Sequence, residues 1–243
     1  MNTFLNDVRD TIIPGHDPRH GPLPPLLLVM TVVAALVDSF SFLTLGHVFV
    51  ANSTGNILFI GFALAHVPGF SISESLLALF AFIIGAAVGG LISSRFKSHR
   101  GRMFSVASSL QSGLLLIAVV LTLLAASPVQ TGYRDLLVVA LAIAMGLQNA
   151  VARKLAVPDL TTTVLTLTIT GLGSDNKFVG GTGSKAGRRL VSIGSMLVGA
   201  VLGAVLVLHA PLYWPLVVAL VCVALVATLS ARTARADGEW ARA

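Results

Sequence analysis

The sequence predicts an all-helical, polytopic transmembrane bundle with six full spans, two further polar segments that break or re-enter, and an internal inverted repeat. The first observation is composition: 55% of the residues are hydrophobic, 11% are charged, and the mean hydropathy is +0.90. A soluble domain carries roughly 25% charged residues, and it must cover its surface with polar groups. Lipid is therefore the solvent that suits this chain.

Six stretches are long enough to cross a bilayer as helices, because a crossing needs about 20 apolar residues. None of them has Lys or Arg in its interior, and in lipid the backbone groups must be paired within each helix. The predicted spans are 25–46, 75–94, 103–126, 135–152, 188–210 and 212–230. Two other stretches, 47–66 and 158–173, are apolar but contain many Asn, Ser, Thr and Gly residues.

The distribution of Lys and Arg decides how those two stretches are counted. Basic residues cluster at 95–102, 153–154, 177–189 and 232–242. If both polar stretches enter and leave on one side, all four clusters and both termini lie in the cytoplasm, and only Arg134 lies outside. If only one of them fails to cross, there are seven spans and the termini lie on opposite sides.

We therefore expect one transmembrane domain, 25–230, made of two related halves at about 25–126 and 135–230. A polar cytoplasmic tail, 1–24, precedes it, and a second cytoplasmic tail, 231–243, follows it. The first tail lacks the apolar stretch of a cleavable signal peptide, so the first span is expected to stay in the protein.

The net charge of +6 and the isoelectric point near 10.3 suggest cytoplasmic loops held against anionic lipid. We expect the lipid bilayer, and not nucleic acid, to be the partner of these charges. The single cysteine, Cys222, cannot form an internal disulfide. We expect no cofactor and no metal, because two histidines in a polar tail, His16 and His20, seldom hold a metal alone.

The two halves of the chain resemble each other. Residues 36–39 resemble 147–150, residues 52–56 resemble 164–168, and residues 85–89 resemble 199–203, with offsets of 111, 112 and 114. Three spans in each half turn the second half upside down, which is the inverted-repeat plan of many transporters and channels. The alternative is that apolar, low-complexity helices align by chance.

Polar residues in the first half provide candidates for a functional site. Asp38 is an acidic residue deep within the first span, so it needs a cavity, a partner or a proton. It is either a proton or cation site, or a helix-end residue bonded to Ser39, Ser41 or a neighbouring helix. The string 52–56 either breaks a helix so that backbone dipoles point into a cavity, or bonds across packed helices.

The second half offers hydroxyl and amide groups. Thr162, Thr166 and Thr170 share one helical face that either lines a polar path or bonds back to the preceding turn. Gln148 and Asn149 add amide groups shortly before this threonine-rich segment, and we expect them to complete a site with Asp38. The predicted substrate or ion path consists of Asp38, Asn52, Ser53, Thr54, Gly55, Asn56, Gln148, Asn149, Thr162 and Thr166.

Small residues at helical spacing predict close helix packing, within the chain or between subunits of a homo-oligomer. These are Gly85, Gly89, Gly90, Gly199 and Gly203. The string 180–185 faintly resembles a phosphate loop, but it lacks the Walker spacing and a preceding strand, so we interpret it as a basic loop.

Together the strings 36–38, 50–56, 144–150 and 157–166 resemble the YoaK family of uncharacterised bacterial inner-membrane proteins, over about 25–230. The resemblance implies the location and the fold, and supplies no substrate or catalytic residue. Where that family usually has Thr-Gly in its second repeat, this chain has Thr166 and Leu167. That departure leaves open whether the second segment breaks as sharply as the first.

The function expected from these patterns is a small transporter or channel that passes an unknown small solute or ion through a midplane polar site. No nucleophile with a plausible base and no paired carboxylates are evident, so we expect no enzymatic activity. The main alternative is a non-transporting assembly or helix-packing subunit. A third is an intramembrane enzyme acting on lipid, for which Asp38 with Ser39 or Ser41 is the thin candidate.

Overall fold

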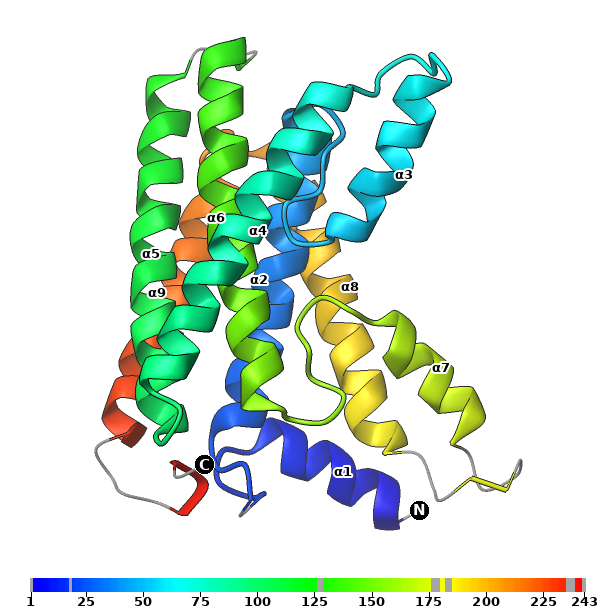
Figure 1. Ribbon diagram of the computed structural model, residues 1–243. Helices are drawn as coiled ribbons and strands as arrows, with labels where there is room; N and C mark the ends of the chain where they lie inside the picture. The colour runs from blue at the N-terminus through cyan, green and yellow to red at the C-terminus, as the bar shows by residue number, and fades with distance from the viewer. Residues whose placement is uncertain are drawn as a thin grey trace.

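The computed structural model describes residues 2–17, 19–125, 129–175, 180–181, 185–234 and 239–241. In those ranges the regular structure is helical, and six helices are long and apolar enough to cross a membrane (Figure 1). They are α2 (Leu23–Thr44), α4 (Ile72–Arg95), α5 (Arg100–Leu124), α6 (Thr131–Leu155), α8 (Ala186–His209) and α9 (Trp214–Ala234). The predicted all-helical bundle with six full spans is confirmed.

Two short helices, α3 (Ser53–Leu64) and α7 (Thr166–Ser174), lie on the same side of the bundle (Figure 1). The chain after α2 turns back into the bundle, and α3 then returns to the end at which α2 finished. The chain after α6 does the same at the opposite end, where α7 returns. Each polar segment is thus broken and turns back toward the end from which it came, as the prediction of broken or re-entrant segments requires, and neither α3 nor α7 is among the six helices long and apolar enough to cross.

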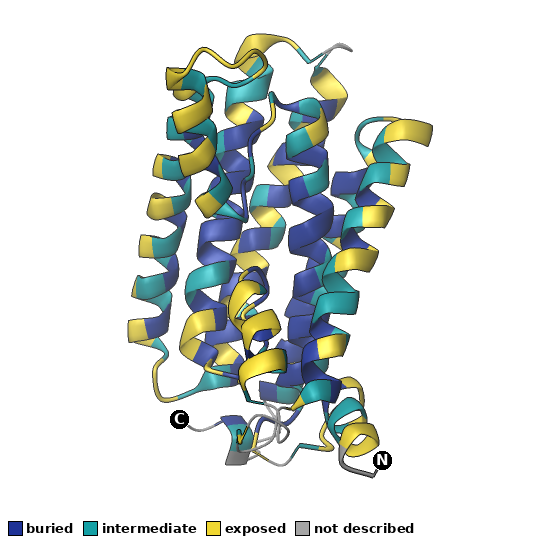
Figure 2. Cartoon of the chain, turned by 90° about the vertical axis from the view of Figure 1, so that its right-hand side faces the viewer, coloured by how far each residue is buried: buried dark blue, intermediate teal, exposed yellow. Residues whose placement is uncertain are grey.

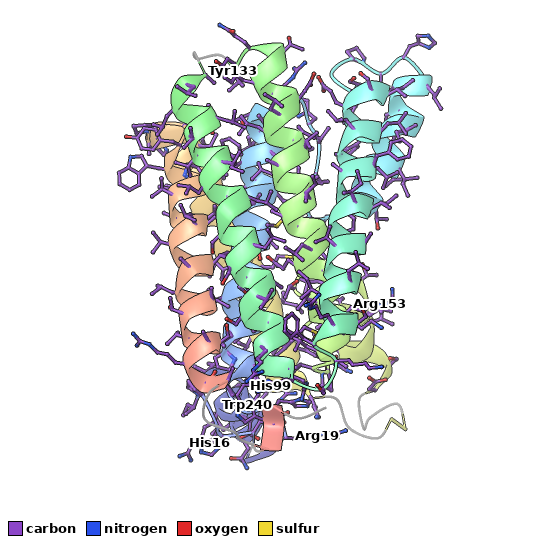
Figure 3. All side chains as sticks on the ribbon, turned by 60° about the vertical axis from the view of Figure 1, so that its left-hand side comes forward. His16, Arg19, His99, Tyr133, Arg153 and Trp240 are labelled. Carbon is purple, nitrogen blue, oxygen red and sulfur yellow. The ribbon has the colours of Figure 1, made fainter. Side chains whose placement is uncertain are left out.

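Both ends of the described chain, α1 (Asn2–Ile12) and η2 (Glu239–Ala241), lie at one end of the bundle, here called the terminal side (Figure 1). The opposite end is called the far side. His16, Arg19, His99 and Trp240 gather at the terminal side (Figure 3). The predicted polar tail 1–24 thus contains a helix that packs on the bundle.

A buried arginine joins that helix to the bundle. Arg188 of α8 is 3% exposed and donates hydrogen bonds to the Asp17 carboxylate at 3.0 Å and to the Thr11 hydroxyl at 3.3 Å. Burial alone would raise the pKa of Asp17, but the hydrogen bond from Arg188 and the neighbouring positive charges bring it below its usual value. Part of the basic cluster 177–189 therefore anchors α1.

Buried residues fill the interior of the bundle, and exposed residues line its outer surface (Figure 2). Many of the exposed side chains are large and apolar, including Leu91 at 70% and Leu208 at 71% exposure. Soluble monomers rarely show such continuous apolar surfaces. The outside of this bundle therefore suits lipid.

Four glycines let pairs of helices pack at backbone distance. A Cβ atom added to Gly85 of α4 would lie 2.1 Å from the carbonyl oxygen of Ile143 on α6. One added to Gly199 of α8 would lie 2.3 Å from the carbonyl oxygen of Val32 on α2. One turn further, Gly89 faces Leu147 and Gly203 faces Leu36. Gly90 has no neighbour within 4 Å of such an atom and lines a pocket.

Arg134, the basic residue that the charge distribution left outside, has a partner. It lies at the far side near the start of α6, and its guanidinium is 2.5 Å from the Glu74 carboxylate at the start of α4. The ion pair compensates this charge, so Arg134 adds little to the positive charge of the far side.

Candidate functional site

Asp38 anchors the first re-entrant loop. It is 4% exposed, and its Oδ1 accepts hydrogen bonds from the backbone N–H groups of Val50 at 2.9 Å and Ala51 at 2.7 Å. Its Oδ2 accepts from the backbone N–H of Asn52 at 3.1 Å and from the Asn52 side-chain amide at 2.6 Å. The carboxylate therefore satisfies donors that a broken helix leaves free in lipid. A negative charge also suits the start of α3.

Asn56 closes the same loop from within α3. Its Oδ1 accepts from the backbone N–H of Phe49 at 2.9 Å, and its Nδ2 donates to the Phe49 carbonyl at 2.6 Å. The side chain is fully buried. Ser41 donates to the Val48 carbonyl at 2.9 Å and so holds the descending part of the loop. These hydrogen bonds fix the conformation of the loop before α3, so the polar residues 52–56 have a structural role as well as being candidates for a site.

A cavity of about 400 Å³ lies between α2 and α8, next to Asp38 and Asn52. Its polar lining comes from Asp38, Ser39 and Asn52. The remaining lining is apolar: Ala35, Phe42, Leu43, Phe49, Met196, Ala200 and Ala204. We call this cavity the Asp38 pocket. Each carboxylate oxygen of Asp38 already accepts two hydrogen bonds. A ligand in the pocket would therefore contact a carboxylate that is already hydrogen-bonded, together with the rings of Phe42 and Phe49.

A second, larger cavity of about 860 Å³ lies between α4, α6 and the second re-entrant segment. We call it the terminal pocket, because Arg153, labelled in Figure 3, lines it near the end of α6 that reaches the terminal side, together with the next residue in the sequence, Lys154. The other lining residues are Phe82, Ala86, Gly90, Asn149, Ala150, Thr161, Val164 and Leu167. This pocket carries positive charge, in contrast to the Asp38 pocket.

Two hydrogen-bonded pairs, one beside each pocket, have the same spacing in the sequence. The Thr163 hydroxyl donates to the Asn149 side-chain oxygen, and these residues are 14 positions apart, as are Asn52 and Asp38. Asp38 and Asn149 differ by 111 positions, and so do Asn52 and Thr163. The hydrogen bonds thus align Asn52 with Thr163, one position away from the pairing of 52–56 with 164–168.

The remaining predicted path residues do not meet at one point. Gln148 is buried in the bundle, where its Oε1 accepts from Gln111 at 2.7 Å and its Nε2 donates to the Met30 carbonyl at 3.0 Å. Thr162 is buried, and its hydroxyl has no hydrogen-bond partner among the described residues. Ser53 also has an unpaired hydroxyl within that part of the chain, Gly55 packs on Phe49, and Thr54 and Thr166 are exposed.

Arg189 of α8 fastens both ends of the second re-entrant segment. Its Nε is 3.0 Å from the Asp159 carboxylate before the loop, and a terminal nitrogen is 2.7 Å from the Asp175 carboxylate after α7. The hydrogen bond from Arg189 holds the pKa of Asp175 below its usual value. Sequence reasoning treated Arg189 only as part of a basic cluster, and gave no signal for this clamp.

We expect Arg189→Gln to release α7 from α8. Hydrogen–deuterium exchange of the segment 159–175 should become faster, while exchange of α3 stays unchanged. Because ionised Asp175 has the lowered pKa, the contact is complete above the usual value of 3.8 and is lost as the pH falls through the folded-state pKa. Equal exchange in the variant and the parent protein would contradict the clamp. Arg232→Gln, a cation on α9, is the control.

Other lining residues were also missed from the sequence. The rings of Phe42 and Phe49 stack with their centroids 5.0 Å apart, and both line the Asp38 pocket. Phe49 reaches the pocket only because the loop after α2 folds back, which the sequence does not reveal. Arg153 and Lys154 were interpreted only through their charge. The equal spacing of Asn52 from Asp38 and of Thr163 from Asn149 was a signal present in the sequence.

Six apolar crossing helices with two re-entrant helices define a multi-pass membrane protein. Residues 26–229 match the family model described as "Protein of unknown function (DUF1275)", and the chain belongs to this family. It is 32% identical over 152 residues to the UPF0700 transmembrane protein YoaK of Bacillus subtilis (strain 168). That match covers 62% of this chain and 65% of the relative, and no solved structure matches. The predicted resemblance to the YoaK family is confirmed.

Proposed function

We propose that this protein is a transporter or channel for a small solute or ion, and not an enzyme, with the Asp38 pocket as its binding site. The observation that carries the proposal is the pair of re-entrant segments, 47–66 and 158–173, which turn back from opposite ends of the bundle and each contribute residues to a pocket. In many transporters, sites form where broken helices meet inside an inverted repeat. The lining of the Asp38 pocket favours a neutral or cationic solute over an anion.

The inverted repeat itself is supported by packing. Gly85 and Gly89 contact Ile143 and Leu147, while Gly199 and Gly203 contact Val32 and Leu36. The glycines are 114 positions apart, and their partners are 111 positions apart. The same interface therefore occurs twice, between α4 and α6 and between α2 and α8. These glycine faces are used inside the chain, which speaks against a subunit that assembles through them.

The proposed setting is the bacterial inner membrane, with the terminal side in the cytoplasm. Helix ends at the terminal side carry most of the Lys and Arg residues, whereas Arg134 at the far side is paired with Glu74. With Cys222 replaced by alanine, single cysteines at Ser98 and Lys185 should react only with a reagent inside the cell. Cysteines at Ser73 and Thr131 should react only with an impermeant reagent outside. Reaction of Ser98 and Lys185 from opposite sides would contradict this orientation.

Transport can be tested without knowing the substrate. Proteoliposomes would be challenged with potassium, methylammonium, glycerol and acetate, and flux would be followed by electrical current or light scattering. Ala204→Leu places a large side chain in the Asp38 pocket, and Ala87→Leu adds the same atoms at an exposed position of α4. We expect a flux of a cationic or neutral probe that Ala204→Leu removes and Ala87→Leu retains. The same flux in the Ala204→Leu variant would exclude the Asp38 pocket.

A further inference from the structure

We propose that the terminal pocket binds a phosphate-type anion, held between Arg153, Lys154 and the start of α7. This inference concerns a second site, at the other end of the bundle from the Asp38 pocket. Binding at this second site does not require that the Asp38 pocket transports a solute.

The starts of α3 and α7 differ in the residue that lies beside them. At the start of α3 the chain supplies its own anion, because the Asp38 carboxylate accepts hydrogen bonds from three consecutive backbone N–H groups. At the start of α7 the corresponding residue is Asn149, a neutral amide. Neither α3 nor α7 has a hydrogen bond from a capping side chain, so the two helix starts differ in the nearby carboxylate and not in the cap. The start of a helix carries a partial positive charge that attracts an anion, and within the part of the chain that the structure describes no carboxylate caps the start of α7.

Two cations are added at the same place. Arg153 and Lys154 occupy the positions that Phe42 and Leu43 hold in the first half, again 111 positions apart. Both side chains are exposed in the pocket, and neither forms an ion pair within the described residues. Three carboxylates on the terminal side form ion pairs with other arginines, and not with Arg153 or Lys154. Asp17 pairs with Arg188, and Asp159 and Asp175 pair with Arg189.

The remaining lining suits a phosphate group. A guanidinium can give a phosphate two parallel hydrogen bonds, and an ammonium adds a point charge. Asn149 and Thr161 add polar groups to the lining. A volume of about 860 Å³ holds a headgroup-sized ligand. Val164 and Leu167 are exposed apolar residues at its edge, where acyl chains would lie.

This chemistry fits either an anionic phospholipid headgroup or a free phosphate, and the experiment separates the two sources. The purified full-length protein, freed of lipid in neutral detergent, would be titrated with inorganic phosphate and, separately, with phosphatidylglycerol or phosphatidylcholine. Binding would be followed by native mass spectrometry and thermal shift. The test variant is Arg153→Gln with Lys154→Gln. The matched control is Arg95→Gln with Lys97→Gln, which removes the same charge from exposed terminal-side residues outside the pocket.

We expect binding of at least one anionic probe, weakened about tenfold or more in the test variant and unchanged in the control. Binding of phosphatidylglycerol alone supports the site with lipid as the source, and binding of inorganic phosphate supports it with a soluble anion as the source. The proposal is overturned if neither inorganic phosphate nor phosphatidylglycerol binds more tightly than phosphatidylcholine. It is equally overturned if both variants lose the same affinity, because binding would then follow overall charge.

Discussion

Replacing Asp38 by alanine should lower the melting temperature of the detergent-solubilised protein by about 10 °C. The change leaves four donors, from Val50, Ala51 and Asn52, without their acceptor in a buried part of the bundle. Each buried donor without a partner costs about 1–3 kcal/mol. For a chain of this size, 1 kcal/mol corresponds to about 2–4 °C.

Asp38→Asn sharpens this test, because it keeps the size of the side chain. One oxygen becomes an NH2 group that points at donors, so we expect nearly the same loss as with alanine. Asp135→Asn is the control, since Asp135 is a carboxylate at the far side with no ion pair among the described residues. Hydrogen–deuterium exchange should also rise in the segment 48–56. A melting temperature for Asp38→Ala within about 2 °C of the parent protein would refute the anchoring role.

The spans could be predicted from the sequence because the demand that lipid makes is local. Each crossing helix must pair its own backbone and show apolar side chains, so length and hydropathy suffice. The predicted 25–46 became Leu23–Thr44, and the predicted 212–230 became Trp214–Ala234. The re-entrant segments were found because Asn, Ser, Thr and Gly interrupt apolar runs. Their short helices, Ser53–Leu64 and Thr166–Ser174, lie largely inside the predicted ranges.

The grouping of the site residues was harder, because it depends on helix direction and rotation. Asp38 and Asn149 each lie beyond the middle of their helices, and α2 and α6 run in opposite directions (Figure 1). They therefore border separate pockets in opposite halves of the bundle. Gln148 precedes Asn149 by one residue, which turns its side chain about 100° around the helix and toward Gln111. Neither the direction of a helix nor the rotation of a side chain around it can be predicted from composition alone.

The glycine interfaces give the second large effect. Gly85→Ala and Gly199→Ala should each lower the melting temperature by about 5–10 °C. The added methyl groups would lie 2.1 Å and 2.3 Å from the carbonyl oxygens of Ile143 and Val32. These obstacles are backbone atoms, so the helices must separate, and both interfaces lose packing along their length. Gly113→Ala is the matched control, because nothing lies within 4 Å of a Cβ atom there. Alanine favours a helix by about 1 kcal/mol over glycine, so this control should be neutral or stabilising.

The comparison of the two interfaces also tests the relation between the halves. Gly85 lies where α4 contacts α6, and Gly199 lies where α8 contacts α2, so the two costs arise at different interfaces built in the same way. Similar costs for the single variants, and a nearly additive cost for the double variant, are expected for distant sites of equal construction. A large cost at Gly85 with none at Gly199 would mean that the second interface tolerates separation, and the inverted-repeat argument would lose its packing support. Because the control isolates the helix propensity of alanine, the difference between Gly85 and Gly113 measures the backbone contact itself.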